Sequence, residues 1–481
     1  MIAVPASLIG ADLAPRDLVE PSIDVLDPAT GTAIGRVALA DTEAVDLAVA
    51  AALEAWPAWA ATPATRRARL LISLARALDE RRDELAASIT AENGKTGVDA
   101  RAEVARAIEH LEAAATAPAL LSGEHVNDIL PGLDATVVRE SLGVVAIIPP
   151  FNFPIMTGLI YWAWALACGN TVVIKPSEQT PFTLGLVGAI ALEVGFAPGV
   201  VNIVQGGRPV VEALIDHPDV AAVSLVGSSV TAAAVYARAS AAGKRVHAAG
   251  GARNPIVVLP DADPVSTAQA ISASAFTMAG QRCLSGSILV IVGAGHEELI
   301  AEVVRLAQSL TVGPGSDEST DVPPLVSRGA VNAAVAAVEE AVSAGATLQV
   351  DGRGAVDPDG GFFFGPTVLT DVPAGSPLLS SETFGPLLSV VAVADLEEAI
   401  GVVNGSPFGN AASIFTADGG AASRFTRQAD VGNVGVNVGV AAPVATIAFG
   451  GRRRSFRGVI HSQGRHAVEF YTDVKSVSTR W

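Results

Sequence analysis

Apolar and polar positions follow two different periods along this chain. Between Thr42 and Leu121, in an alanine-rich stretch, apolar residues recur at helical spacing. From Gly143 the pattern changes to short β-branched runs, each followed by a helical segment: GVVAII, TVVIK, VVNIV and AAVSLVG. Continuous apolar strands alternating with helices predict a parallel sheet that is covered on both faces.

A second alternating region begins at PIVVLPDAD and ends near Gly435, which predicts a second α/β unit. A short polar excursion separates the early helices from the first sheet, and the tail VEFYTDVKSVSTRW has β character. The tail could pair with another strand of the chain or with another subunit. The predicted boundaries are 1–124 with 142–250 for the first unit, 251–464 for the second, and 125–141 with 465–481 for an arm and tail.

One segment resembles a membrane span, because the stretch from Ser141 to Ile174 carries no charged residue. Prolines, glycines and asparagines interrupt it, and the longest unbroken part, Leu159 to Cys168, is too short for a helix that crosses about 30 Å of hydrocarbon. We expect a buried strand, a loop, a buried helix and a second strand there, and no membrane partner.

Composition narrows the class of protein. The 481 residues are 50% hydrophobic and 17% charged, which excludes global disorder and a small stapled scaffold. A formal net charge of −18 disfavours nucleic acid and anionic membranes as partners. Two cysteines in so long a chain cannot form a disulfide framework, and no basic segment precedes an apolar run at the start, so we expect a cytoplasmic protein.

Polar residues that directly follow the predicted strands are candidates for ligand binding, because ligands of parallel sheets bind at the carboxyl ends of strands. Asn152 in PPFNFP could donate to a developing oxyanion, or could be a turn residue. Lys175 and Glu178 could hold ribose hydroxyls or a phosphate, or could be solvated loop charges. LVGSS precedes a helix from about Thr231 and offers backbone N–H groups to a pyrophosphate.

The two cysteines differ in their surroundings. Cys283 in AGQRCLSGS lies among glycines and beside Arg282, a setting that could expose the sulfur and lower its pKa, although a buried packing role is the alternative. Cys168 lies in the apolar run WAWALACGN and is expected to be inert. The seven histidines show no metal-ligand spacing, so we predict no metal site.

Together these motifs resemble the aldehyde dehydrogenase superfamily over nearly the whole chain. PPFNFP, CGNTVVIKPSEQTP, GFAPGVVNIVQGG, HPDVAAVSLVGS, AGQRCLSGS, ETFGPLL and NGSPFGNAASIFT occur in the family's order. The resemblance implies an α/β fold with a Rossmann-type NAD-binding domain, an α/β catalytic domain and a small β oligomerisation arm. These expectations apply in turn to the three predicted parts of the chain.

The same resemblance assigns roles to individual residues. Cys283 would be the nucleophile, and Asn152 with the Cys283 N–H would form the oxyanion hole. The expected cofactor-binding residues are Phe151, Lys175, Glu178, Gly227, Ser228, Glu382 and Phe384. A carboxylate at Glu178 would repel a 2′-phosphate, which favours NAD over NADP.

One departure from the family bears on the reaction. Hydrolytic members carry a general-base Glu where this chain has Ala249, and no carboxylate lies between Val246 and Leu259. Water attacks a thioester poorly without a base, whereas a thiol is partly ionised at neutral pH. The residues therefore favour release of an acyl group by a thiol such as coenzyme A.

A narrower resemblance agrees with this expectation. AFTMAGQRCLS, GKRVHAAGGARN, EVARAIEHLE and SFRG…FYTDVKSVSTRW are similar to the methylmalonate-semialdehyde dehydrogenase group, which acylates coenzyme A. In that group an Asn usually stands at the position of Ala249. Its substrates carry a carboxylate, which would bind Arg106 and Arg282 here. The alternative for Arg106 is a surface ion pair with Glu103 or Glu109.

The expected activity is NAD-dependent oxidation of malonate or methylmalonate semialdehyde, with coenzyme A as co-substrate and acetyl-CoA or propionyl-CoA as product. Two alternatives stay open: a hydrolytic aldehyde or semialdehyde dehydrogenase, and a catalytically silent protein of the same fold. The resemblance also implies a homo-oligomer, either a dimer or a tetramer, whose arm and tail pair.

Overall fold

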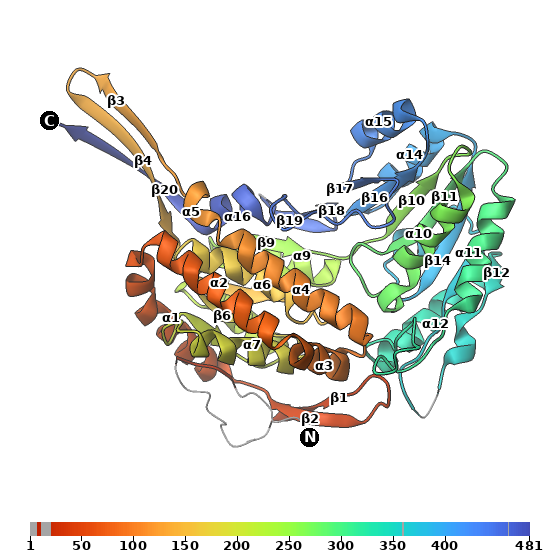
Figure 1. Ribbon diagram of the computed structural model, residues 1–481, viewed down its shortest axis with the longest axis horizontal. Helices are drawn as coiled ribbons and strands as arrows, with labels where there is room; N and C mark the ends of the chain where they lie inside the picture. The colour runs from red at the N-terminus through yellow and green to blue at the C-terminus, as the bar shows by residue number, and fades with distance from the viewer. Residues whose placement is uncertain (1–6, 11–20, 358–359, 460) are drawn as a thin grey trace.

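The computed structural model describes residues 7–10, 21–357, 360–459 and 461–481. Two α/β units stand side by side, and a narrow arm projects from the first (Figure 1). A β-hairpin lies at the edge of the first unit, with its strands β1 (Ser22–Leu26) and β2 (Ala33–Ala38) paired antiparallel.

The first unit is built on a six-stranded sheet of order β19-β9-β8-β5-β6-β7. All neighbouring strands are parallel except β19 and β9. The strands are β5 (Val144–Ile148), β6 (Thr171–Ile174), β7 (Val201–Ile203), β8 (Val220–Val226), β9 (Arg245–Ala249) and β19 (Phe456–Gly458).

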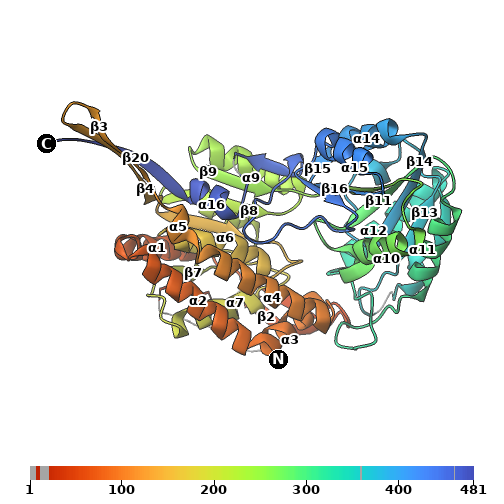
Figure 2. The same ribbon diagram turned by 45° about the horizontal axis from the view of Figure 1, so that its top comes forward.

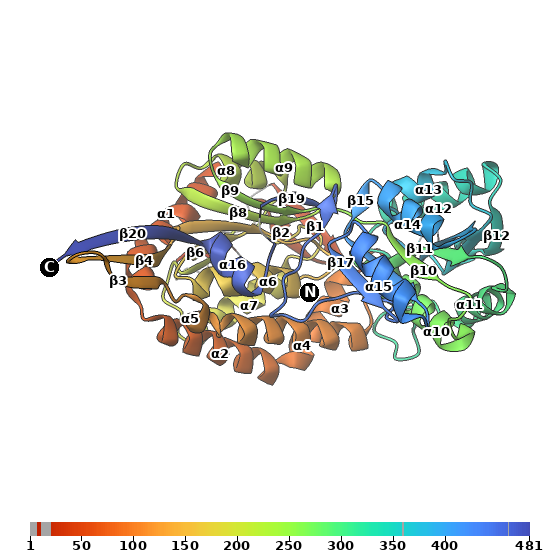
Figure 3. The same ribbon diagram turned by 90° about the horizontal axis from the view of Figure 1, so that it is seen from above.

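Helices cover both faces of this sheet, as the strand pattern predicts. Val145 and Ile147 of β5 pack with α2, α4, α6 and α7, whereas Val144 and Ala146 pack with α1, α8 and α9 on the other face. Figure 3 shows α8 and α9 along one side and α2 and α4 along the other. The helices are α1 (Thr42–Ala61), α2 (Ala64–Glu80), α3 (Arg82–Asn93), α4 (Gly97–Ala114), α5 (Ala117–Leu120), α6 (Met156–Ala167), α7 (Phe182–Glu193), α8 (Arg208–Asp216) and α9 (Ser229–Ala241).

The second unit contains a seven-stranded sheet of order β12-β13-β14-β11-β10-β16-β17, in which β12 alone runs antiparallel to its neighbour. Figure 2 shows α14 and α15 above this sheet and α10 and α11 below it. The strands are β10 (Asn254–Val258), β11 (Gly286–Val292), β12 (Thr347–Val350), β13 (Thr367–Thr370), β14 (Leu387–Val393), β16 (Ala411–Phe415) and β17 (Asn433–Val436).

Its helices and the remaining short elements complete the unit. The helices are α10 (Pro264–Phe276), η1 (Thr277–Gly280), α11 (Glu297–Ser309), α12 (Arg328–Ser343), η2 (Gly352–Ala355), α13 (Pro377–Ser380), α14 (Leu396–Gly405) and α15 (Gly419–Gln428). The two-residue strands β15 (Phe408–Gly409) and β18 (Arg452–Arg453) pair antiparallel.

The arm is a three-stranded antiparallel sheet of order β20-β4-β3. Its strands are β3 (Glu124–Leu130), β4 (Leu133–Ser141) and β20 (Thr472–Arg480), and every residue of β3 is exposed. The tail therefore pairs with a strand of its own chain, from Thr472 opposite Ser141 to Arg480 opposite Leu133.

The C-terminal part departs from the expected boundaries. VEFY belongs to α16 (Gly464–Tyr471), not to a strand, because Ala467, Val468 and Tyr471 share a helical face that is buried against the first unit. Strand β19 also joins the first sheet, although the boundary at 464 assigned it to the second unit. The polypeptide thus returns to the first unit after β17.

The uncharged segment from Ser141 to Ile174 folds as strand β5, a loop, helix α6 and strand β6, as expected, and α6 is buried. Among the described residues, α1 alone is long and apolar enough to cross a membrane by length and composition. Its residues Val45, Ala48 and Val49 belong to the core beneath the first sheet. Helix α1 thus packs one face against the first sheet, with 33% of its most apolar stretch buried.

Candidate active site

A single cavity of about 910 Å³ brings together nine of the predicted site residues. It is lined by the segments that follow β5, β6 and β8 and by loops of the second unit. The predicted residues in its wall are Phe151, Asn152, Lys175, Glu178, Gly227, Ser228, Cys283, Glu382 and Phe384. Residues up to 233 positions apart in the sequence, from Phe151 to Phe384, thus meet where the carboxyl ends of β5, β6 and β8 face the loops that precede β11 and β14.

The segment after β6 places a cation and an anion at the cavity wall. Lys175 Nζ donates to Glu178 Oε2 at 2.8 Å, and the Lys175 side chain is 5% exposed while that of Glu178 is 44% exposed. Burial alone would raise the pKa of Glu178, but the Lys175 ammonium outweighs burial and holds the pKa below its usual value. Glu178 thus presents an ionised carboxylate to the cavity.

The segment after β8 leads into the N-terminus of α9. Ser228 is the N-cap residue of this helix, and its side-chain oxygen accepts from Thr231 N at 3.2 Å. Gly227 and Ser228 both line the cavity beside the first turn of the helix. Free N–H groups and the helix dipole make this corner suitable for an anion.

The opposite wall carries Glu382 and Phe384. Glu382 Oε1 accepts from Ala252 N at 2.8 Å, and burial raises the pKa of this carboxyl. A Cβ on Gly251 would lie 2.1 Å from Glu382 Oε2, so the carboxylate occupies space that only a glycine leaves open. The rings of Phe151 and Phe384 meet edge to face at 5.8 Å between centroids.

Cys283 lines the cavity and is half-buried, whereas Cys168 is buried in the core. The expectation of a lowered thiol pKa is wrong for this structure. Burial and the nearby Glu382 raise the pKa of Cys283 to about 11, against the lowering effects of Arg282 and of the backbone N–H groups of Cys283 and Leu284. Arg282 beside the sulfur does not compensate for the loss of solvent.

Asn152 is held from both sides. Its side-chain Nδ2 donates to Gln281 O at 2.9 Å, and its backbone carbonyl accepts from Lys95 Nζ at 2.8 Å. Lys95 in turn forms a buried ion pair with Glu103 at 2.6 Å. Glu103 also accepts from the first N–H groups of the following helix segment, at Ile155 and Met156.

The two predicted substrate arginines do not line this cavity. Arg106 pairs with Glu109, the alternative noted from the sequence, and its Nη2 donates to Pro443 O at 3.0 Å. Arg282 Nη2 donates to the carbonyls of Ala273 and Ser274 at the end of α10. Arg282 Nε is buried without a hydrogen-bond partner.

Sequence patterns did not indicate Gln281, Asn254, Asn410, Lys95 or Glu103, all of which hold the backbone around Cys283 or Asn152. These residues are buried and polar: Glu103 lies within α4, Asn254 begins β10, and the other three lie between elements. Their fixed partners become visible only once distant segments are brought together.

The carboxylates that line the cavity are Glu178, Glu212 and Glu382. Only Glu382 among them appears among the charges acting on the Cys283 thiol. Ala249 ends β9 directly before Gly250 and Gly251, which line the cavity, so its position offers no carboxylate there. The described residues contain no cluster suited to a metal ion.

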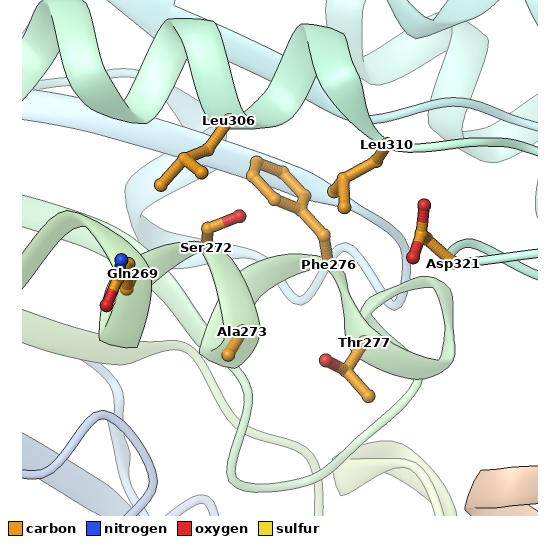
Figure 4. A pocket seen from close by; sticks show the side chains of 8 residues that line it. All are labelled: Gln269, Ser272, Ala273, Phe276, Thr277, Leu306, Leu310 and Asp321. Atoms are coloured by element: carbon orange, nitrogen blue, oxygen red, sulfur yellow. The ribbon is translucent and has the colours of Figure 1, made fainter.

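A second, smaller cavity of about 260 Å³ lies between α10 and α11. Figure 4 shows the Phe276 ring between Leu306 and Leu310, with Asp321 at one end. The Asp321 carboxylate accepts from Thr311 N at 2.9 Å, and none of the eight lining residues carries a thiol, amine or imidazole. The chemistry therefore belongs to the larger cavity.

Comparison with known proteins agrees with this geometry. Residues 16–477 match the aldehyde dehydrogenase family. A malonate-semialdehyde dehydrogenase of Geobacillus kaustophilus is 43% identical over 458 residues, covering 95% of each chain. One of Oceanobacillus iheyensis is 41% identical, covering 95% of this chain and 94% of the other.

Solved structures give the same result. The methylmalonate-semialdehyde dehydrogenase of Oceanimonas doudoroffii is 38% identical and superposes with a TM-score of 0.97, over 100% of this chain and 99% of the other. A Sinorhizobium meliloti protein assigned as a methylmalonate-semialdehyde dehydrogenase, in complex with NAD, is 35% identical with a TM-score of 0.98, over 100% and 98%.

Proposed function

The chain belongs to the aldehyde dehydrogenase family, as its motifs indicate, and on that premise we propose that it oxidises malonate or methylmalonate semialdehyde with NAD and transfers the acyl group to coenzyme A. The main support for the proposal is that one cavity contains a thiol, a side-chain amide and, at the carboxyl ends of strands, residues suited to a nucleotide. The named relatives act on semialdehydes, and one of the similar structures contains NAD.

The residues of the cavity fit NAD. The Glu178 carboxylate, fixed by Lys175, suits the two hydroxyls of an adenosine ribose and would repel a 2′-phosphate. Gly227 and Ser228 at the start of α9 suit the pyrophosphate. Glu382 and Phe384 suit the ribose at the nicotinamide end. When bound there, NAD supplies the hydride acceptor.

Cys283 performs the covalent step. The thiol first loses its proton to solvent in the open cavity, and the thiolate sulfur then attacks the aldehyde carbon. The carbonyl electron pair moves to oxygen, where the Asn152 amide and the Cys283 N–H stabilise the negative charge. One Asn152 N–H is bound to Gln281 O, which fixes the amide and leaves its second N–H for the oxyanion. Loss of hydride then leaves a thioester on Cys283.

The β-carboxylate of the bound acyl group makes decarboxylation possible. The C–C bond breaks, CO2 leaves, and the electron pair is taken up by the thioester carbonyl as an enolate, which a proton at the α-carbon converts to the acyl thioester. The coenzyme A thiolate then attacks that carbonyl, displaces the Cys283 thiolate and gives acetyl-CoA or propionyl-CoA. A thiol nucleophile needs no strong base.

We assign the substrate carboxylate to Arg282 and Arg106. Arg282 adjoins Cys283 in the chain, and its buried Nε lacks a partner, so an anion there would satisfy a donor that is costly to leave unpaired. Arg106 would release Glu109 and bind the substrate carboxylate instead. This exchange costs little, because the ion pair between Arg106 and Glu109 is exposed to solvent. A guanidinium fork suits a carboxylate in either case.

The arm supports a proposal of self-association. Strand β3 pairs with β4 on one side, and no strand in the described part of the chain pairs with its outer edge. Its residues are all exposed, among them the apolar side chains of Val126, Ile129 and Leu130. Such an edge is a template for pairing with another chain. We propose that it pairs with a second copy in a dimer or tetramer. The cytoplasmic location expected from the sequence stays a prediction.

The test compares the native enzyme with Ala249→Glu. The native enzyme should form NADH steadily only when coenzyme A is present, and its product should be an acyl-CoA. Ala249→Glu restores a base at the end of β9 and should give NADH and free acid without coenzyme A. Brisk NADH formation and free acid from the native enzyme without coenzyme A would overturn the acylating assignment and favour hydrolysis.

A further inference from the structure

The peptide group between Cys283 and Leu284 is bonded at its carbonyl end by two side-chain amides. Asn254 Nδ2 donates to Cys283 O at 2.9 Å, and Asn410 Nδ2 donates to the same oxygen at 2.7 Å. Both asparagines are at least nine-tenths buried. A carbonyl oxygen has two lone pairs, so the two amides saturate it.

The other end of the same peptide group is the backbone N–H of Leu284. This N–H is one of the groups that lower the pKa of the Cys283 thiol, so it favours the ionised form. Hydrogen bonds that share one peptide group polarise one another, because donation to the carbonyl makes the N–H more positive. Donation from the amides of Asn254 and Asn410 to the Cys283 carbonyl therefore strengthens the stabilisation that the Leu284 N–H gives to the thiolate.

The two donors are fixed by the second sheet. Asn254 begins β10, and its Oδ1 accepts from Ala411 N at 3.0 Å while its Nδ2 also donates to Ser285 O. The Asn410 carbonyl accepts from both the backbone N and the side-chain Nδ2 of Asn433. Strands β10 and β16 are paired, so both amides are held in one rigid frame.

We propose that Asn254 and Asn410 are positioning residues, which fix the Cys283–Leu284 peptide and, through its N–H, make the Cys283 sulfur a readier nucleophile. The proposal rests on the proposed function in one respect, that Cys283 is the nucleophile. Asn410 is the better site for a test. Among the residues that the structure describes, its side chain forms a hydrogen bond only with Cys283 O.

The experiment measures the rate of Cys283 alkylation by iodoacetamide from neutral to alkaline pH, together with kcat and KM. Asn410→Leu removes the donor at similar volume and should slow alkylation about threefold at a given pH, the equivalent of about half a pH unit. Asn410→Asp should slow it more, since a carboxylate also repels the thiolate. Asn410→Ser, which keeps a donor, should fall between Asn410→Leu and the native enzyme, and kcat should follow the same order with KM for NAD unchanged.

Asn202→Ala is the matched control. It removes a buried amide that donates to Val172 O and Gly199 O in the first unit, so it should lower Tm without changing the alkylation profile. If Asn410→Leu does not fold, the isosteric Asn410→Asp carries the same comparison. Alkylation profiles that are equal in the native enzyme and the folded Asn410 variants would overturn the proposal.

Failure of the proposed function gives a different result. Turnover that survives in Cys283→Ala would show that Cys283 is not the nucleophile, whatever the Asn410 variants show. Loss of turnover in Cys283→Ala together with unchanged profiles in the Asn410 variants would overturn only the role of the asparagines.

Discussion

The side-chain amide of Asn152 donates to the backbone carbonyl of Gln281, with 2.9 Å between the atoms. This bond joins the loop after β5 in the first unit to the turn that carries Cys283 in the second. Gln281 is itself fixed, because its Oε1 accepts from Val326 N at 3.0 Å and its Nε2 donates to Pro324 O at 3.3 Å. The segment that carries the Cys283 thiol and the side-chain amide of Asn152 are therefore held in a fixed relative position by one backbone carbonyl.

Asn152→Ala should lower kcat/KM by about 10²–10³, because it removes an oxyanion donor from a buried site. Alkylation of Cys283 should continue, since the thiol stays in place. Asn202→Ala is the control, because that buried amide donates to Val172 O and Gly199 O away from the cavity. A kcat/KM loss in Asn152→Ala no greater than in Asn202→Ala would contradict the role given to Asn152.

Gly251→Ala should raise KM for NAD by about tenfold or more. The new Cβ would lie 2.1 Å from Glu382 Oε2, so it displaces the carboxylate assigned to the nicotinamide ribose. Gly329→Ala is the control, because the nearest atom to its Cβ is Ser327 Oγ at 3.8 Å. Steady-state kinetics with varied NAD measure KM for both variants. Equal KM values in Gly251→Ala and Gly329→Ala would show that Glu382 does not bind the cofactor. A loss of about tenfold corresponds to 1.4 kcal/mol of binding.

Arg106→Ala should raise KM for malonate semialdehyde more than KM for propanal, which has no carboxylate. The measurement is kcat/KM for each aldehyde at saturating NAD and coenzyme A. We expect a discrimination of about tenfold to a hundredfold, as for loss of a charge-assisted bond. Glu109→Ala frees Arg106 from its ion pair and should not reduce activity toward the carboxylated substrate. An equal effect of Arg106→Ala on both aldehydes would leave it as a surface ion-pair residue.

The reactivity of the cofactor-free enzyme should depend steeply on pH. Because burial and Glu382 raise the pKa of Cys283 to about 11, the thiol is protonated at neutral pH and only about one molecule in a thousand is ionised at pH 8. Raising the pH removes this proton, so the alkylation rate should rise about tenfold per pH unit. An alkylation rate that levels off near pH 8.5, about the pKa of an ordinary thiol, would show that burial does not control the pKa of Cys283.

Sequence patterns predicted the layered fold well, because each layer has a local signal. Continuous β-branched runs such as Val144–Ile148 indicate strands buried on both faces, and the helices between them follow from apolar spacing. The tail was different. Val468 and Tyr471 suit a strand by composition, but they form part of α16 because the first unit buries their helical face.

The candidate site was predicted where residues follow strands, since topology alone brings Lys175, Glu178 and Gly227 to one edge. The local structure around Cys283 could not be predicted in this way. Met278 and Ala279, a few residues before it, have φ values of 56° and 53°, a left-handed turn that neither residue type signals. The amides that hold its carbonyl come from Asn254 and Asn410, so no local pattern shows them.

The central claim is that Cys283 forms a thioester which waits for a thiol. The most direct measurement mixes the enzyme with NAD and methylmalonate semialdehyde in the absence of coenzyme A, and follows NADH and the mass of the Cys283 peptide. The account predicts a burst of NADH that stops once the sites are filled, an acyl adduct on Cys283, and release of acyl-CoA when coenzyme A is added. Steady NADH formation with free acid and no adduct on Cys283 would contradict it and would favour hydrolysis.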